Sequence, residues 1–184
     1  MRILIMVAMG LFMLPATAWS NTGFQFQFAG VGVPDNSPRV DGVRLYLLYA
    51  KSERVSGFDL GFAALSEVET QEGFSFNFGI SRVTGSSNGA AGSLVNLHTG
   101  NDSGLNIAPL NIVKKNSGVN GGMLNITEST SAVDIGMFNM SKKSQTQLGM
   151  LNFTNEIQNL QVGLLNFADN GIFPVFPFFN YPKP

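Results

Sequence analysis

The sequence predicts an all-β protein built from tandem repeats, and three observations support this fold class. The 184 residues include 21 glycines and 16 phenylalanines but only 12% charged residues, which favours short strands and turns over long surface helices. Apolar and polar residues alternate, as they do along strands. Finally, one sequence motif occurs five times in tandem. The five copies are GLNIAPLNIV, GVNGGMLNIT, AVDIGMFNMS, QTQLGMLNFT and NLQVGLLNFA.

Residues 1–20 have the features of a secretory signal peptide. Arg2 precedes a long apolar run, and the small residues Ala16 and Ala18 follow it. Cleavage after Ala18 fits the usual rule, and cleavage after Ser20 is nearly as compatible. An uncleaved membrane anchor is the alternative, but the apolar run is short for a spanning helix. We therefore expect export to the periplasm, outer membrane or cell surface of a Gram-negative bacterium.

The composition limits how an exported chain of this kind is stabilised and what it binds. The chain contains no cysteine, so stability must come from packing and backbone hydrogen bonds rather than from disulfides. The formal net charge is −1, and it falls by one further unit without Arg2. This charge predicts no binding of nucleic acid.

Residues 21–41 differ from the repeats that follow them. Phe24, Phe26 and Phe28 alternate with glutamines, which predicts a half-buried strand with one aromatic face before the break at Pro34. Because the segment precedes the repeats, we expect it to cap the first of them.

Residues 42–171 are predicted to contain about nine tandem β-repeats of 13–16 residues. An asparagine marks each unit in the second half of this region, and Tyr49, Ala64 and Ile80 are the corresponding positions of earlier units. The marker asparagines are Asn96, Asn111, Asn125, Asn139, Asn152 and Asn166.

Each unit has the same internal pattern, numbered from the residue after its leading glycine or glycine equivalent. Positions 1, 3, 5, 6 and 8 are apolar, position 2 is polar and position 7 is the asparagine. We expect the apolar positions to be buried. Position 4 is a glycine in four units: Gly122, Gly136, Gly149 and Gly163. Since the alternation changes phase between positions 5 and 6, each unit is predicted to be a strand, a corner, a second strand and a charged loop.

Two architectures accept such a unit. In a β-solenoid each unit is one coil, so equivalent residues lie above each other about 4.8 Å apart. In an antiparallel meander or barrel each unit is a strand and a turn. The repeated asparagine favours the solenoid, because stacked asparagines can hydrogen-bond along a ladder. The meander remains the alternative.

Residues 172–184 are predicted to form a second cap. The segment is rich in phenylalanine, which supplies apolar area, and in proline, which cannot donate a hydrogen bond to a further strand. Asn180 repeats the marker asparagine, so we expect a degenerate last coil that ends in a plug.

The sequence offers no convincing catalytic, cofactor or metal site. His98 is the only histidine and is expected in a solvent-exposed loop, without partners for a metal. Asp59 and Asp134 occupy position 2, where other units have asparagine or glutamine, so we expect a solvated polar row rather than an acid–base pair. Enzymatic activity is therefore not expected.

The units of the form G-h-x-h-G-h-h-N-h, where h is apolar, resemble a family of bacterial surface-repeat proteins. The resemblance covers Gly42 to about Tyr181 and is clearest from Gly118 to Ala168. It implies a cell-envelope or surface location without enzymatic activity, and it supplies no binding residues. Units before Asn96 lack the asparagine, so the resemblance does not predict regular stacking there.

These observations predict an exported cell-envelope or surface β-repeat protein with a structural or interaction role. The alternative is an outer-membrane β-barrel or a membrane-associated protein, since export and glycine and aromatic richness are also typical of that class. The partner and the oligomeric state are not indicated by the sequence, and membrane association stays open.

Overall fold

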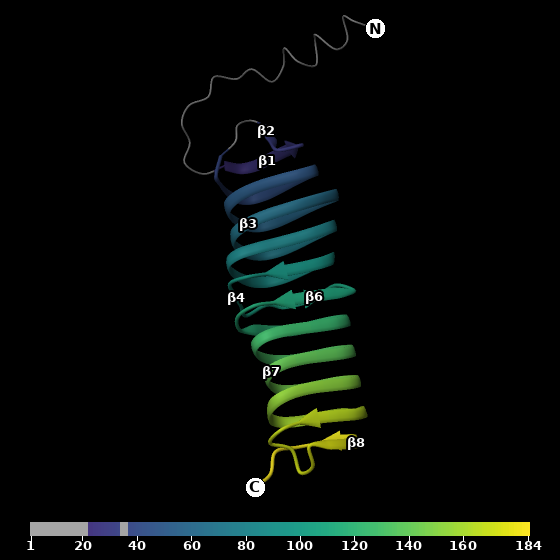
Figure 1. The fold of residues 1–184 in the computed structure, drawn as a ribbon. Coiled ribbons are helices and arrows are strands. Elements are labelled where there is room, and N and C mark those ends of the chain that lie inside the picture. The colour runs from purple at the N-terminus through teal and green to yellow at the C-terminus, as the bar shows by residue number, and fades with distance from the viewer. Residues whose placement is uncertain (1–21, 34–36) are drawn as a thin grey trace, which may run out of the picture.

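A computed structural model describes residues 22–33 and 37–184 as a rod of stacked β-coils (Figure 1). The predicted signal peptide, residues 1–20, lies outside the described residues. Neighbouring coils pair as parallel strands, which confirms the β-solenoid and shows that the antiparallel meander or barrel was wrong. A membrane-crossing helix is absent from residues 22–33 and 37–184.

Strands account for nearly all of the described chain, because the backbone stays extended as it passes the corners of each coil. The two long strands, β3 and β7, therefore run through several coils each (Figure 1). The elements are β1 (Thr22–Phe28), β2 (Val31–Val33), β3 (Arg39–His98), β4 (Asn101–Asp102), β5 (Leu105–Ile107), β6 (Leu110–Val113), β7 (Ser117–Ala168) and β8 (Val175–Asn180).

The register between coils repeats the register of the sequence. Asn96 pairs with Asn111, and Asn111 pairs with Asn125. The side-chain hydrogen bonds between equivalent residues of adjacent coils join positions 13 to 16 residues apart. This spacing agrees with the predicted unit length.

The charged segments that were predicted to be loops are extended as well. Residues 128–131, 142–146 and 155–159 lie inside the continuous strand β7. The coils within β7 therefore have a third extended side in place of a loop, whereas Lys114 and Lys115, also predicted to be in a loop, do lie outside the strands, between β6 and β7. The prediction missed this side because its polar residues lack the apolar alternation by which a half-buried strand is recognised.

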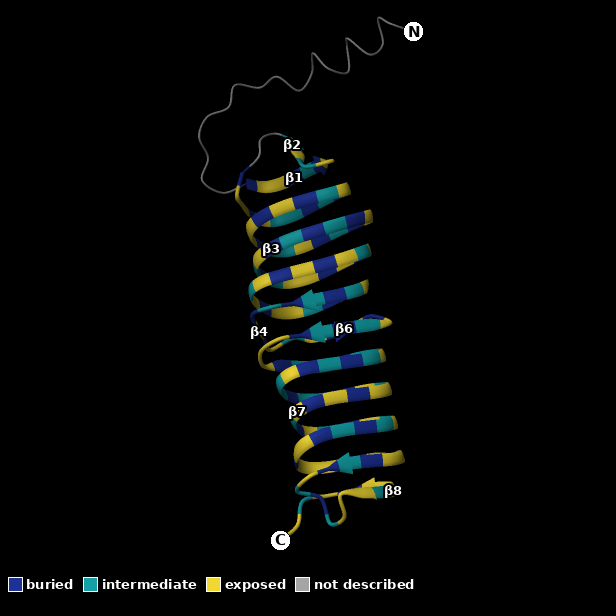
Figure 2. Cartoon of the chain, in the orientation of Figure 1, coloured by how far each residue is buried: buried dark blue, intermediate teal, exposed yellow. Residues whose placement is uncertain are grey.

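Buried and exposed residues alternate along the coils (Figure 2), and most of the buried ones are polar, which contradicts the expectation that the apolar positions would be buried. Positions 2 and 7 face inward, whereas Ile135, Met137 and Phe138, at positions 3, 5 and 6 of one unit, are all exposed. Small buried apolar clusters occur in the first coils, around Val55 and around Tyr46. A coil of so few residues bent into three sides encloses a narrow space, which short amide and hydroxyl side chains fill while bonding to each other.

The corner predicted between positions 5 and 6 is visible in the burial pattern. Met137 and Phe138 are consecutive residues that both face outward, although a straight strand would point them to opposite sides. Leu164 and Leu165 repeat this arrangement. The chain therefore bends outward at this point, and two apolar sides of the coil meet there.

At the first end of the rod, β1 behaves as a further coil, because it pairs in parallel with β3 from Val40 to Leu47. Its glutamines, Gln25 and Gln27, are buried, and Phe24 and Phe28 are exposed, so the aromatic face points outward. The strand β2 then pairs antiparallel with β1.

At the other end, β8 pairs antiparallel with the last residues of β7, Gln161 to Phe167. The expectation of a degenerate last coil was wrong in this respect, because a coil would pair in parallel. Asn180 is nevertheless buried and donates a hydrogen bond from Nδ2 to the Phe173 carbonyl oxygen at 3.1 Å. An antiparallel strand thus lies at each end of the stack.

Candidate functional site

The structure brings all six marker asparagines together in one continuous ladder inside the rod. Nδ2 of each asparagine except the last, Asn166, donates to Oδ1 of the asparagine in the next coil. The donor–acceptor distances are 2.9 Å for Asn96–Asn111 and 2.8 Å for Asn111–Asn125, Asn125–Asn139, Asn139–Asn152 and Asn152–Asn166.

A second hydrogen bond explains why the ladder residue is an amide. Asn125 also donates from Nδ2 to the Ile135 carbonyl oxygen at 3.1 Å, and Asn139 donates to the Leu148 carbonyl oxygen at 3.1 Å. The acceptors are backbone carbonyls at position 3 of the next coil, just before the corner. Both amide hydrogens and the amide oxygen are thus satisfied, which removes the cost of burying them.

The repeat glycines lie against this ladder. A Cβ atom at Gly149 would be 2.3 Å from the carbonyl oxygen of Gly136 in the preceding coil and 2.6 Å from Nδ2 of Asn139. Gly122 and Gly163 have similar approaches to the preceding coil and to an asparagine amide. None of the four ladder glycines has a positive φ, so they are required for space rather than for conformation.

A second interior row occupies position 2, and the sequence-based interpretation assigned it to solvent. Nδ2 of Asn106 donates to Oδ1 of Asn120 at 3.0 Å, and Nδ2 of Asn120 donates to Oδ1 of Asp134 at 2.7 Å. Further along, Nε2 of Gln161 donates to Oε1 of Gln147 at 2.7 Å. The polar residue recurring at position 2 with the same period as the asparagine was the signal for this row.

Asp134 belongs to the position 2 row and is fully buried, so the solvated row predicted for it was wrong. Burial raises the pKa of its carboxyl group, and the hydrogen bond that Asn120 donates to its Oδ1 opposes this shift in part. A raised pKa means that the folded protein disfavours the charged carboxylate.

Asp59 was also predicted to be solvated, but it is buried beside Arg44. The guanidinium donates to both carboxylate oxygens, at 2.6 Å and 2.8 Å, and also to Ser52 and Ser66. Burial alone would lower the pKa of Arg44, but the charge of Asp59 and the hydrogen bonds to it outweigh burial and raise it. The guanidinium carbon lies 4.8 Å from the ring centre of Tyr46. This network replaces the amide rows in the first coils.

His98, predicted to be exposed in a loop, is instead 1% exposed. Its Nδ1 is hydrogen-bonded to Oδ2 of Asp102, which also accepts a hydrogen bond from Nδ2 of Asn106 at 2.7 Å. Oδ1 of Asp102 accepts from the Gly104 amide at 2.8 Å. The pair therefore holds the turn that leads into the next coil and is enclosed within the rod.

The coils before Asn96 are also stacked, although they lack the asparagine (Figure 1). The equivalents predicted from the sequence were partly wrong. Ala64 is buried, but Ile80 is exposed and its neighbour Ser81 faces the interior; Tyr49 is likewise half-buried beside the fully buried Ala50. Unit lengths vary in this region, so counting along the sequence placed Ile80 and Tyr49 next to the inward-facing residues and not on them.

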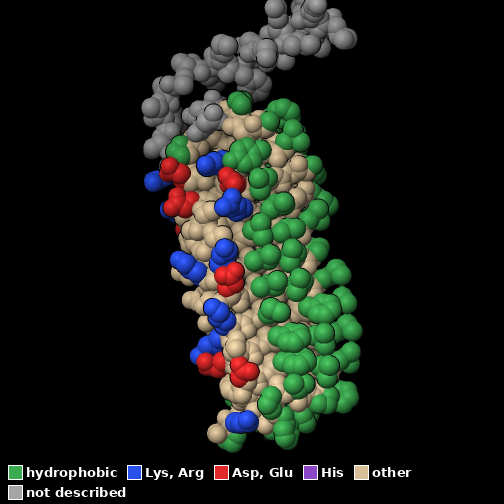
Figure 3. Space-filling model, in the orientation of Figure 1, with side chains coloured by type: hydrophobic (Ala, Val, Ile, Leu, Met, Phe, Trp, Pro, Cys, Tyr) green, Lys and Arg blue, Asp and Glu red, His purple; other side chains and the backbone are tan. Residues whose placement is uncertain are grey.

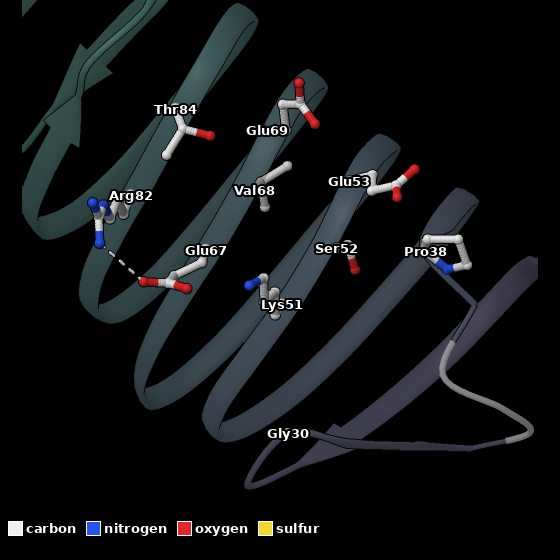
Figure 4. Close-up of a pocket in the computed structure, with 10 residues that line it drawn as sticks. All are labelled: Gly30, Pro38, Lys51, Ser52, Glu53, Glu67, Val68, Glu69, Arg82 and Thr84. Atoms are coloured by element: carbon white, nitrogen blue, oxygen red, sulfur yellow. Dashed lines mark hydrogen bonds and ion pairs between the residues drawn. The ribbon is translucent and has the colours of Figure 1, made fainter.

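A shallow polar hollow of about 580 Å³ crosses the first coils on the charged side of the rod (Figure 4). Arg82 donates to Glu67 at 3.1 Å across it, and Glu53 lies 3.8 Å from Arg39. Lys51 and Glu69 also line it. Residues 22–33 and 37–184 contain no group of three His, Cys, Asp or Glu side chains that could hold a metal ion.

The largest unusual feature of the surface is an apolar face that extends along the rod. Apolar side chains gather over one part of the surface, and lysine, arginine and acidic side chains gather over another (Figure 3). The apolar face comprises the outward residues at positions 1, 3 and 5 on one side of the corner and at positions 6 and 8 on the other. Examples are Phe58, Phe76, Ile107, Met137, Phe138 and Leu164.

Comparisons with protein-family models, curated proteins and solved structures found no match to this chain.

Proposed function

We propose that the protein is an exported, non-catalytic β-solenoid of the bacterial cell envelope or surface, with a structural or interaction role. The single observation that carries this proposal is the continuous apolar face on a rod whose interior is internally hydrogen-bonded. Monomeric soluble proteins rarely expose large contiguous apolar patches, and such patches mark binding surfaces.

The interior is consistent with a structural role. The polar rows, the glycines and the buried Arg44–Asp59 pair make contacts within and between coils, so these polar groups are committed to holding the stack together. His98 and Asp102, which resemble parts of a catalytic set, are buried against each other. The leader in residues 1–20 supports export.

Fractionation of the producing cell tests the location. The chain is expected in the periplasmic, outer-membrane or culture fraction, with its amino terminus at Trp19 or Asn21. Recovery in the cytoplasm with residues 1–20 intact would contradict the proposal. A matched variant with Leu4→Arg and Val7→Arg in the apolar run of the leader should remain in the cytoplasm, because the translocation signal requires that run.

A further inference from the structure

The apolar face is too extensive for one ordinary protein contact. Its large side chains are on average about half exposed, and at about 100 Å² for a half-exposed aromatic they present on the order of 2,000 Å² to the surroundings. A standard interface covers about 800 Å² on each partner. A second copy packed flat against one side of the rod would leave much of this area in water.

The shape of the apolar face is also unsuited to a flat protein partner. Positions 5 and 6 both face outward, so the two apolar sides meet at a convex edge that includes Met137 and Phe138, and Leu164 and Leu165. A flat partner can cover only one side of a convex edge. A deformable partner can contact both sides of the edge.

A hollow lies within the face near the middle of the chain. Ala90, Gly92 and Ser93 replace the larger residues of neighbouring units, between Phe76 on one side and Ile107 on the other, and leave a groove of about 620 Å³. Under a flat protein partner this groove would remain a void, which is unfavourable. Flexible hydrocarbon chains would fill it.

Charge distribution indicates how such a surface would be oriented. Ion pairs lie along the polar side of the rod from its first coils to its last, including Arg54 with Glu72 and Lys143 with Glu156. Standing the rod upright in a bilayer would bury these charges, whereas laying it flat keeps them in water. The net charge of −1 supplies no attraction to anionic headgroups.

We propose that the apolar face inserts into the hydrocarbon of a lipid surface, with the rod axis parallel to that surface and the charged side facing water. This inference rests on the proposed function only in taking the apolar face as the interaction surface. It makes binding depend on buried apolar area and not on headgroup charge.

The test is flotation of the full chain, purified from producing cells, with phosphatidylcholine vesicles. The protein is expected to float with the vesicles, to the same extent in 0.1 M and 1 M NaCl, and equally when phosphatidylglycerol is added. The double variant Phe138→Ser and Leu165→Ser should reduce the bound fraction about tenfold or more, since two side chains leave the hydrocarbon.

Matched controls separate folding from binding. Lys142→Ser and Lys115→Ser, at exposed lysines outside the apolar face, should float like the unchanged protein. All variants should keep the same thermal midpoint, because the altered side chains are exposed. Binding that disappears in 1 M NaCl would overturn the proposal, as would equal flotation of the double variant.

The alternative occupant gives a different result. If a second copy covers the face, light scattering will show a dimer, and this dimer will not float with the vesicles. Phe138→Ser should then dissociate it into monomers. Failure to float would overturn the lipid proposal without affecting an envelope location found by fractionation. Recovery in the cytoplasm would instead contradict the proposed function and leave the vesicle result intact.

Discussion

Gly136 and Asn125 lie in adjacent coils, and the absence of a side chain on one leaves room for the other. A Cβ atom at Gly136 would be 2.7 Å from Nδ2 of Asn125 and 2.6 Å from the Gly122 carbonyl oxygen. The glycine at position 4 and the asparagine at position 7 are thus parts of one arrangement. The side-chain amide of Asn125 reaches the Ile135 carbonyl oxygen only because Gly136 leaves space for it.

Gly136→Ala is therefore expected to lower the free energy of unfolding by about 1–3 kcal/mol, because the added methyl group forces the coils or the amide apart. Gly121→Ala is the matched control, since a Cβ there would meet nothing closer than the Asn106 carbonyl oxygen at 3.8 Å. Thermal and urea unfolding compare the two. Equal stability of both variants would refute the steric account.

Asn139→Leu should destabilise the protein by about 1–3 kcal/mol, because Asn125 and the Leu148 carbonyl oxygen lose buried hydrogen bonds. Asn152→Leu should lower the free energy of unfolding by a similar amount. Met140→Leu, at the exposed neighbouring position, should change the unfolding free energy by less than about 0.5 kcal/mol. An unfolding midpoint unaffected by Asn139→Leu would show that the ladder adds nothing to stability.

Removing one member of the buried pair, by Asp59→Asn or Arg44→Met, should cost about 3–5 kcal/mol, since a charge or its hydrogen-bonding partners are left unpaired inside the rod. The exposed pair formed by Arg54 and Glu72, 2.7 Å apart, is the control. Arg54→Ala should cost less than about 1 kcal/mol. Similar losses in both places would mean that burial of Arg44 does not matter.

Asp134→Asn should stabilise the protein at pH 7 by about 1 kcal/mol, because the charged carboxylate is unfavourable in the interior. The pKa of Asp134 is raised in the folded state from 3.8, so the folded state binds its proton more tightly than the unfolded state does. The protonated Asp134 carboxyl therefore makes its whole contribution to the free energy of unfolding below pH 3.8. This contribution is lost as the pH rises through the raised pKa of the folded state.

Thermal midpoints measured from pH 3 to pH 8 check this sign. The difference between the variant and the unchanged protein should be small at pH 3 and should grow toward neutral pH. A difference that is constant across this range would attribute the effect to packing and not to protonation.

Deleting residues 172–184 should cause aggregation or degradation, because the last coil of β7 loses its antiparallel partner β8 and exposes an unpaired strand edge. Size-exclusion chromatography with light scattering, and proteolysis, measure the outcome. Deleting only Lys183 and Pro184 is the control, since β8 then remains. A monomeric truncation as stable as the whole chain would rule out the capping role.

The sequence alone determined the all-β class, the repeat period and the bend between positions 5 and 6. These are local properties: the period follows from the recurring Asn125 and Asn139, and the bend follows from a fixed change of phase. The sequence favoured in-register stacking over the meander, because identical amides gain a hydrogen bond only when like meets like, and the structure decided between the two.

Only the tertiary structure decided which face of each strand points inward. Alternation defines two faces, and the usual rule that apolar residues are buried chose the wrong one for Ile135 and Asp134. In this narrow coil the hydrogen bonds between amides of successive coils outweigh the burial of large apolar side chains, for which the interior has no room. The Arg44–Asp59 pair was equally beyond sequence reasoning, because it depends on which residues of adjacent coils are stacked against each other. The His98–Asp102 pair is local in sequence, but only the fold encloses it within the rod.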